Sequence, residues 1–333
     1  MLFDPAPKQR IEDFFDNEAS ISSLSSKLAE PKVRAIVVLG PRRTGKTSLM
    51  RVTLAKTGLP NVFMDARAVE SRQDFYRKLS AGLEGVFKGI RLSALEFGAR
   101  IEFGSGDNDI TQAIKGKKFV LVIDEAQLLS SLGIANFLAY IYDNEKGIKL
   151  LISGSEVGLL NKFIGQEDAD SPLFGRAIET IRTERLGPNE ASRFIKAGAA
   201  ELKLDITDAE ISDAIANLDG IIGWLTLYGW TRRGMAHGKA LAEAIRQGAL
   251  LTRSEFDKFL ASAKAGKRYL AIAKAIAKGE RKWGGVKAFA EKELGYAISD
   301  SQFGDYINSL VNHEFIDASY SFVDPLLERA FRE

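Results

Sequence analysis

The stretch VVLGPRRTGKTSLM, residues 37–50, contains the pattern G-x-x-x-x-G-K-[ST] between Gly40 and Thr47. An apolar run precedes the pattern and a helical pattern follows it, which is the strand–loop–helix setting of a phosphate-binding loop. In this setting glycines let backbone amides close on phosphate oxygens, and the helix N-terminus adds a positive dipole. The stretch therefore predicts a nucleotide site. The residues that we assign to nucleotide binding here are Gly40, Pro41, Arg42, Arg43, Thr44, Gly45, Lys46, Thr47 and Ser48.

A second motif, FVLVIDEAQLL at residues 119–129, supplies the acids that such a site needs. Lys46 is expected to reach the β- and γ-phosphates of the nucleotide, and the Thr47 hydroxyl to ligate Mg²⁺. Asp124 would stand at the carboxyl end of a buried strand as the partner of that Mg²⁺. Glu125 is the expected base that orients the attacking water. The two motifs together predict an ATPase with ATP or ADP and Mg²⁺ as its cofactors.

Three more residues are candidates for the catalytic site. In LLISGSEVGLL, residues 150–160, Ser153 or Ser155 would stand beside Glu125 and sense the γ-phosphate; the alternative is a strand-to-helix turn with serine caps. Arg176 follows a loop that begins at Pro172, so its guanidinium could meet a phosphate in cis or from a neighbouring chain. The alternative for Arg176 is a surface salt bridge.

Composition limits the classes of protein that this chain can belong to. The chain has 333 residues, of which 45% are hydrophobic and 27% charged, ordinary values for a globular protein with two or three domains. It has no cysteine, which excludes disulfides and thiolate metal sites. The apolar run GIIGWLTLYGW, residues 220–230, is too short to cross a bilayer, and the N-terminus lacks the order of a signal peptide. We therefore expect a cytoplasmic protein with no membrane partner.

The pattern along the chain predicts a parallel α/β sheet covered by helices on both faces, followed by two helical domains. A hairpin is expected at residues 90–103. The expected domains are an ATPase core at 1–185, a helical lid at 186–252 and a winged-helix domain at 253–333, the last read from three helices and a hairpin. Helices are expected to begin at Pro188 and near Thr207. The expected strands are residues 35–40, 61–65, 118–124, 148–153 and 178–183.

The charge pattern argues against a winged helix that reads DNA. The expected recognition helix lies in SDSQFGDYINSLVNHEF, residues 299–315, which holds three acids and no Lys or Arg, so it offers no counterion release. Residues 258–292 hold ten Lys or Arg against two acids. These cations could form a nonspecific DNA face, a solvated helix face, or a surface that docks on an acidic partner. We favour protein docking and leave DNA contact open.

In these and several further motifs the chain resembles the archaeal ATPase family of STAND-class P-loop ATPases, relatives of AAA+ proteins that include replication initiators. The resemblance extends from end to end. It implies an ATPase core, a helical lid and a C-terminal winged helix whose mutual orientation depends on the bound nucleotide. It rests on DPAPKQRIEDFFDNE, LGPRRTGKTSL, LVIDEAQ, LISGSEVGLL, SPLFGR, GIIGWL and SFVDPLLERAF.

Two departures from the family pattern fall on positions that should shape the base pocket. The Arg-Glu pair expected near the adenine reads Asn17-Glu18, and the Gly-x-Pro of the lid reads Gly220-Ile221-Ile222. We still assign Asn17 to nucleotide binding.

Three hypotheses for the function follow. The first is a switch in which slow ATP hydrolysis changes how the lid and winged helix pack, with a protein partner or self-assembly. The second is a DNA-binding, initiator-like ATPase. The third is a binding module with a structural nucleotide, against which the intact Lys46, Asp124 and Glu125 argue.

Overall fold

The computed structural model describes residues 1–15, 18–87, 109–166 and 168–332. The hairpin expected at residues 90–103 and the candidate Asn17 lie outside this part of the chain. The described residues form two compact units. One, the sheet unit, contains Lys8–Gly40 and Lys46–Thr183; the other, the helical unit, contains Met1–Pro7, Pro41–Gly45 and Glu184–Glu333.

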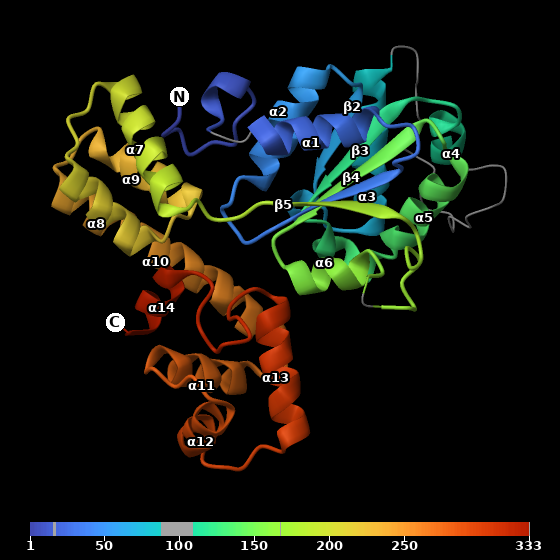
Figure 1. Ribbon diagram of the computed structural model, residues 1–333. Coiled ribbons are helices and arrows are strands. Elements are labelled where there is room, and N and C mark those ends of the chain that lie inside the picture. The colour runs from blue at the N-terminus through green and yellow to red at the C-terminus, as the bar shows by residue number, and fades with distance from the viewer. Residues whose placement is uncertain (16–17, 88–108, 167, 333) are drawn as a thin grey trace. The chain divides into compact units, whose positions relative to one another are not determined.

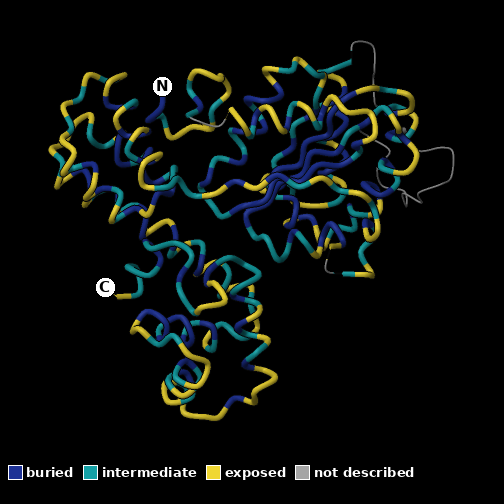
Figure 2. Tube along the Cα trace, viewed as in Figure 1, coloured by how far each residue is buried: buried dark blue, intermediate teal, exposed yellow. Residues whose placement is uncertain are grey.

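The sheet unit is built on five parallel strands in the order β2-β3-β4-β1-β5. The strands predicted from sequence are confirmed, with ends that shift by at most one residue. Every residue of β1 and β3 is buried, because helices cover both faces of the sheet (Figure 2). The strands are β1 (Ala35–Leu39), β2 (Asn61–Asp65), β3 (Phe119–Asp124), β4 (Ile148–Gly154) and β5 (Ile178–Arg182).

Alternate residues of each strand enter different cores, as the pleat requires. Val37 and Leu39 of β1 belong to a core that includes residues of α3, α5 and α6, whereas Ile36 and Val38 belong to a core that includes residues of α1 and α2. Figure 1 shows these helices around the sheet. The helices of this unit are α1 (Glu18–Ala29), α2 (Lys46–Thr57), α3 (Arg72–Val86), α4 (Asp109–Ile114), α5 (Ile134–Asn144) and α6 (Val157–Phe163). Three short 3-10 turns complete it: η1 (Ile11–Asp13), η2 (Ala66–Ala68) and η3 (Ala126–Leu132).

The helical unit contains a helical region followed by a winged-helix domain. Pro188 opens the first helix, and Thr207 caps the second by accepting the Glu210 N–H at 3.3 Å, as predicted. The hairpin expected near the C-terminus is a tight turn closed by an antiparallel bridge between Ile316 and Phe322. The helices are α7 (Pro188–Leu202), α8 (Asp208–Leu218), α9 (Ile222–Arg232), α10 (His237–Ser262), α11 (Gly266–Ala277), α12 (Trp283–Leu294), α13 (Asp300–Asn312) and α14 (Pro325–Arg332).

Helix α10 is one continuous helix through the boundary predicted between residues 252 and 253. Its N-terminal part packs on α9, while its C-terminal part supplies Phe256 to the core of the winged-helix domain. The division into lid and winged-helix domains at that position therefore stays a prediction. In the described residues, no helix is both long enough and apolar enough to span a membrane.

Candidate functional site

The loop between β1 and α2 has the backbone of a phosphate cradle. Gly40, Arg43 and Gly45 all have positive φ, at 150°, 65° and 90°. A Cβ at Gly40 would collide with the backbone carbonyl of Thr183, so this position requires glycine. Helix α2 begins directly after the loop at Lys46 and leaves its first amides without helical partners. This arrangement suits an anion held by backbone N–H groups.

Lys46 is buried, with 5% of its surface exposed, and its Nζ donates to the carbonyl of Gly40 at 2.7 Å. The ammonium is therefore held at the start of the loop, at the N-terminus of α2. A buried ammonium at a helix N-terminus is an unfavourable placement unless an anion balances it. The Glu125 carboxylate is one such anion, since the Lys46 charge acts on it.

The candidate metal residues are brought together as predicted. Thr47 lies in the first turn of α2, and its Oγ1 donates to Asp124 Oδ2 at 2.7 Å. The hydroxyl of Ser153 donates to the other oxygen, Asp124 Oδ1. Asp124 ends β3 with 1% of its surface exposed. Hydroxyl and carboxylate oxygens are the donors that Mg²⁺ prefers, and with phosphate oxygens and water one or two protein ligands suffice. The residues fit Mg²⁺.

Glu125 is fixed beside this pair by three donors. Its Oε2 accepts from Ser155 N at 3.0 Å, Ser155 Oγ at 2.8 Å and Gln127 Nε2 at 2.8 Å. Burial raises the pKa of the Glu125 carboxyl, but the Lys46 ammonium and these hydrogen bonds more than offset burial, so the pKa lies below its usual 4.5. Glu125 is therefore ionised at neutral pH. Ser155 contacts Glu125, and Ser153 contacts Asp124, so the two serines serve different acids.

Replacing Ser155 by Ala should shift the acid limb of the pH–rate profile. The substitution removes one of the donors that lower the Glu125 pKa, so that pKa should rise. With Glu125 as the expected base, the ionised carboxylate is the active form, so turnover of Ser155→Ala should be lost at a higher pH than in the wild type as the solution is acidified. The measurement is kcat as a function of pH for both proteins. Coincident acid limbs would contradict a role for Ser155 in tuning Glu125.

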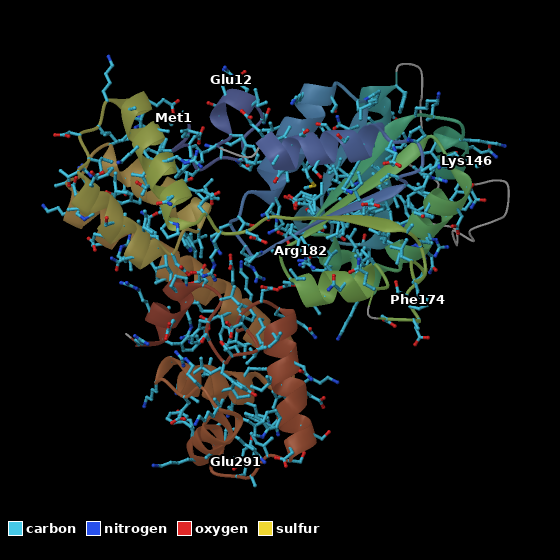
Figure 3. All side chains as sticks on the ribbon, viewed as in Figure 1. Met1, Glu12, Lys146, Phe174, Arg182 and Glu291 are labelled. Carbon is cyan, nitrogen blue, oxygen red and sulfur yellow. The ribbon has the colours of Figure 1, made fainter. Side chains whose placement is uncertain are left out.

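Arg176 lies on the surface of the sheet unit. Its Nε donates to Asp143 Oδ1 at 3.0 Å, its Nη2 lies 2.5 Å from Asp143 Oδ2, and its Nη1 donates to the Pro172 carbonyl. Phe174 in the same loop is 52% exposed and points away from the ribbon (Figure 3). The structure thus places Arg176 in the surface salt bridge that was the alternative to an arginine finger.

We expect Arg176→Ala to leave turnover within about twofold of wild type, because the measured worth of exposed ion pairs is small. The rate should be compared with that of Asp143→Asn, which breaks the same pair from the other side. A loss of 10³-fold or more in Arg176→Ala alone is the signature of a finger. That result would identify Arg176 as a catalytic residue.

The remaining loop residues have partners that the sequence did not indicate. Thr44 Oγ1 donates to the Pro41 carbonyl at 2.8 Å, which braces the loop from within. Ser48 Oγ accepts the Lys8 N–H at 2.9 Å. Arg42 donates to the His313 carbonyl at 3.0 Å, and Arg43 is paired with Glu255 at 2.6 Å. The arginines of the loop are thus engaged by the helical unit, to which residues 41–45 belong.

Arg67, which follows β2, lies near the candidate site and was not predicted from the sequence. Its guanidinium forms a bidentate pair with the Asp65 carboxylate: Nε donates to Oδ1 at 2.9 Å and Nη2 to Oδ2 at 2.7 Å. The pairing with Asp65 raises the pKa of Arg67, with smaller contributions from Asp124 and Glu125. A signal was present in the sequence, since Asp65 ends a strand parallel to β3 at the level of Asp124. Carboxyl ends of parallel strands share one edge of a sheet.

The chain is similar to known proteins in its ATPase region, in its C-terminal domain and over its whole length. A family model for an AAA domain matches residues 32–163, and one for the MCM protein C-terminal winged helix-turn-helix domain matches residues 263–322. The structure is a close match to the Walker-type ATPase PABY2304 of Pyrococcus abyssi: each chain is covered over 100% of its length, with 27% identity and a TM-score of 0.86. A search of curated proteins finds no match.

Two archaeal proteins share the fold at lower identity. The ORC2 protein of Aeropyrum pernix in its ADP form has 14% identity and a TM-score of 0.54, with 99% of this chain and 95% of that chain covered. Cdc6p from Pyrobaculum aerophilum has 15% identity and a TM-score of 0.51, with 99% and 96% covered. At these identities the likeness concerns the fold alone.

Proposed function

We propose that this chain, an AAA-domain P-loop ATPase with an MCM-like C-terminal winged helix, is a molecular switch in which the bound nucleotide sets the packing of the helical unit. The observation that supports this is the position of the phosphate loop. Residues Pro41–Gly45 pack with the helical unit, and the Gly223 N–H of α9 donates to the Arg43 carbonyl at 3.0 Å. A ligand that reshapes the loop must therefore act on α9 as well.

The chemistry that we assign to the site is hydrolysis of ATP. Lys46 and the amides of the loop hold the phosphates, while Thr47 and Asp124 hold Mg²⁺. When bound, Mg²⁺ neutralises charge on the phosphate oxygens. Glu125 orients a water toward the γ-phosphate and accepts its proton. The Ser155 and Gln127 donors converge on Oε2, so we assign Oε1 of Glu125 to that water.

We expect this hydrolysis to be slow. A switch needs its nucleotide to persist long enough to hold one packing of the helical unit, so rapid turnover would defeat it. Slow turnover fits a STAND-type timer in the cytoplasm better than a metabolic enzyme.

We further propose that the switch acts on a protein partner or on a second copy of the chain rather than on DNA. Several cations of the basic stretch are balanced within the helical unit. Lys274 pairs with Glu293 at 2.6 Å, Lys287 with Asp300 at 2.5 Å, and Arg281 with Glu328 at 3.1 Å. Paired cations release fewer counterions on meeting phosphates. The match of residues 263–322 to the MCM winged-helix model keeps a DNA-binding initiator as the second candidate.

One experiment tests the proposal and separates it from the second candidate. Hydrogen exchange of residues 184–332 is compared without nucleotide, with MgADP, and with a nonhydrolysable MgATP analogue. We expect different protection in the three states, and identical protection would refute the switch. In parallel, the hydrolysis rate per chain is measured over a wide range of protein concentration, with and without duplex DNA. A rate that rises with concentration supports self-assembly, and stimulation by the duplex would favour the initiator.

A further inference from the structure

Arg43 of the phosphate loop is held by side chains that lie far away in the sequence. Its Nη2 donates to Glu255 Oε1 at 2.6 Å and its Nη1 to Glu255 Oε2 at 3.3 Å, a bidentate pair. The Nη1 atom also lies 3.9 Å from Asp324 Oδ2, and the guanidinium carbon lies 4.2 Å from the centre of the Trp224 ring. Only 18% of the Arg43 side chain is exposed. Two carboxylates and an indole face thus enclose one guanidinium, the geometry in which arginine binds most specifically.

The backbone of Arg43 is held by the same region. Arg43 has φ 65°, a left-handed conformation that non-glycine residues adopt at a cost and keep only where their surroundings fix them. Its carbonyl accepts the Gly223 N–H at 3.0 Å. A Cβ at Gly223 would lie 2.7 Å from the Arg43 Cβ, so only glycine permits this approach. The conformation of the loop at Arg43 therefore depends on α9.

Asp324 connects this anchor to the C-terminus. Its carboxylate accepts the Trp224 Nε1–H at 3.0 and 3.1 Å and the Leu326 N–H at 2.9 Å, at the start of α14. Burial raises the pKa of Asp324, an effect that the Arg43 charge opposes. Glu255 lies on α10. Trp224 of α9, Glu255 of α10 and Asp324, which directly precedes α14, thus all contact Arg43.

Arg42 strengthens the same attachment. Its Nε lies 3.6 Å from Glu255 Oε2, and its guanidinium carbon lies 5.4 Å from the centre of the Phe315 ring. Glu255 therefore forms ion pairs with two successive arginines of the phosphate loop. Their charges are balanced by acids of the helical unit, which leaves the backbone amides and Lys46 as the groups that we assign to phosphate.

We propose that Glu255 and Asp324 are positioning residues for nucleotide binding: by holding Arg43 they fix the phosphate cradle and make its shape depend on the packing of α9, α10 and α14. This inference rests on the proposed switch and names the residues through which nucleotide and helical unit are coupled. The coupling is reciprocal, so a nucleotide that needs the ordered loop stabilises the packing of α14 by the same factor.

The test compares Glu255→Gln/Asp324→Asn with a matched control, Glu328→Gln, which removes an acid of α14 that pairs with Arg281 and Arg332. Affinities for MgADP and for a nonhydrolysable MgATP analogue are measured by calorimetry. We expect about a tenfold rise in Kd for the double variant, in the range of ordinary coupling between sites. The control should bind like wild type. Unchanged or tighter binding in the double variant would overturn the proposal, since tighter binding would mean that the acids withhold Arg43 from the phosphates.

A double-mutant cycle that combines the acid substitutions with Arg43→Gly distinguishes a positioning role of the two acids from a general loss of folded structure. Glycine keeps the left-handed backbone accessible and removes the anchored side chain. In that background the two acid substitutions should change Kd by clearly less than in the wild type, because Arg43 is absent and only the Arg42 contact with Glu255 is left to lose. If the acids act only on the stability of the fold, their effect on Kd would persist. If the double variant does not fold, Gly223→Ala replaces it: no charge changes, and displacement of Arg43 should give a similar loss of affinity.

Hydrogen exchange of residues 315–332 gives a readout independent of hydrolysis. In wild type and Glu328→Gln, nucleotide should slow exchange in this segment, and in Glu255→Gln/Asp324→Asn it should not. If the wild type itself shows no slowing, the proposed switch fails. If the wild type responds and the double variant responds equally, the switch stands and the assignment of Glu255 and Asp324 is overturned.

Discussion

Lys46→Ala is expected to abolish nucleotide binding. The Lys46 ammonium is buried at the N-terminus of α2 and donates to the Gly40 carbonyl, so it is fixed where phosphate oxygens meet the loop. Truncating one partner of a buried, hydrogen-bonded charge pair costs about 3 kcal/mol or more, equivalent to at least a 100-fold rise in Kd. Calorimetric titration with MgADP and MgATP measures the loss directly.

Two further variants show whether this loss is specific. Lys46→Met keeps most of the side-chain volume and removes the charge, so it should lose binding to a similar degree without opening a cavity. Lys56→Ala removes an exposed lysine from the last turn of the same helix and should bind normally. Normal binding in Lys46→Met would mean that backbone amides suffice, and the assigned role of Lys46 would be wrong.

The fold follows from local patterns that tertiary contacts do not override. Apolar runs such as residues 35–39 and 119–124 lie in the middle of the sheet, where both faces need apolar side chains. Helix starts at Pro188 and Thr207 carry their own chemistry, a fixed φ and a capping hydroxyl. Helix α14 was not predicted, because eight residues are too few to show a period. Its buried Leu326 and Leu327 explain why it forms.

The residues of the candidate site also fall into two groups, those that the sequence predicts and those that it does not. Thr47, Asp124 and Glu125 could be predicted because motif spacing and the shared edge of parallel strands place them together. The anchor on Arg43 could not, since Glu255 and Asp324 lie more than 200 residues away and neither belongs to a known spacing. The only signal was indirect: GIIGWL and SFVDPLLERAF carried the family resemblance, and they contain Gly223, Trp224 and Asp324. The distribution of charges along the sequence does not predict which arginine a given acid will pair with in the fold.

The second large effect concerns Glu125, where binding and turnover should separate. Glu125→Gln keeps the shape of the side chain and leaves Lys46, Thr47 and Asp124 unchanged, so nucleotide affinity should stay within about threefold of wild type. The amide is neutral and cannot accept a proton as the carboxylate does. Loss of a positioned general base lowers rates by about 10²–10⁴-fold. Single-turnover hydrolysis of MgATP, with protein in excess, isolates this step from product release.

The structure suggests why the effect should be confined to the chemical step. The substitution leaves Ser155 and Gln127 free to donate to the carbonyl oxygen of the new amide, so the left-handed turn at residue 125, φ 56°, should persist. Glu84→Gln, an exposed acid on α3, is the matched control and should hydrolyse ATP at the wild-type rate. Normal hydrolysis by Glu125→Gln would exclude this carboxylate as the base. A variant that binds MgATP without cleaving it would also hold the proposed switch in its ATP state, where the exchange of residues 315–332 can be measured without turnover.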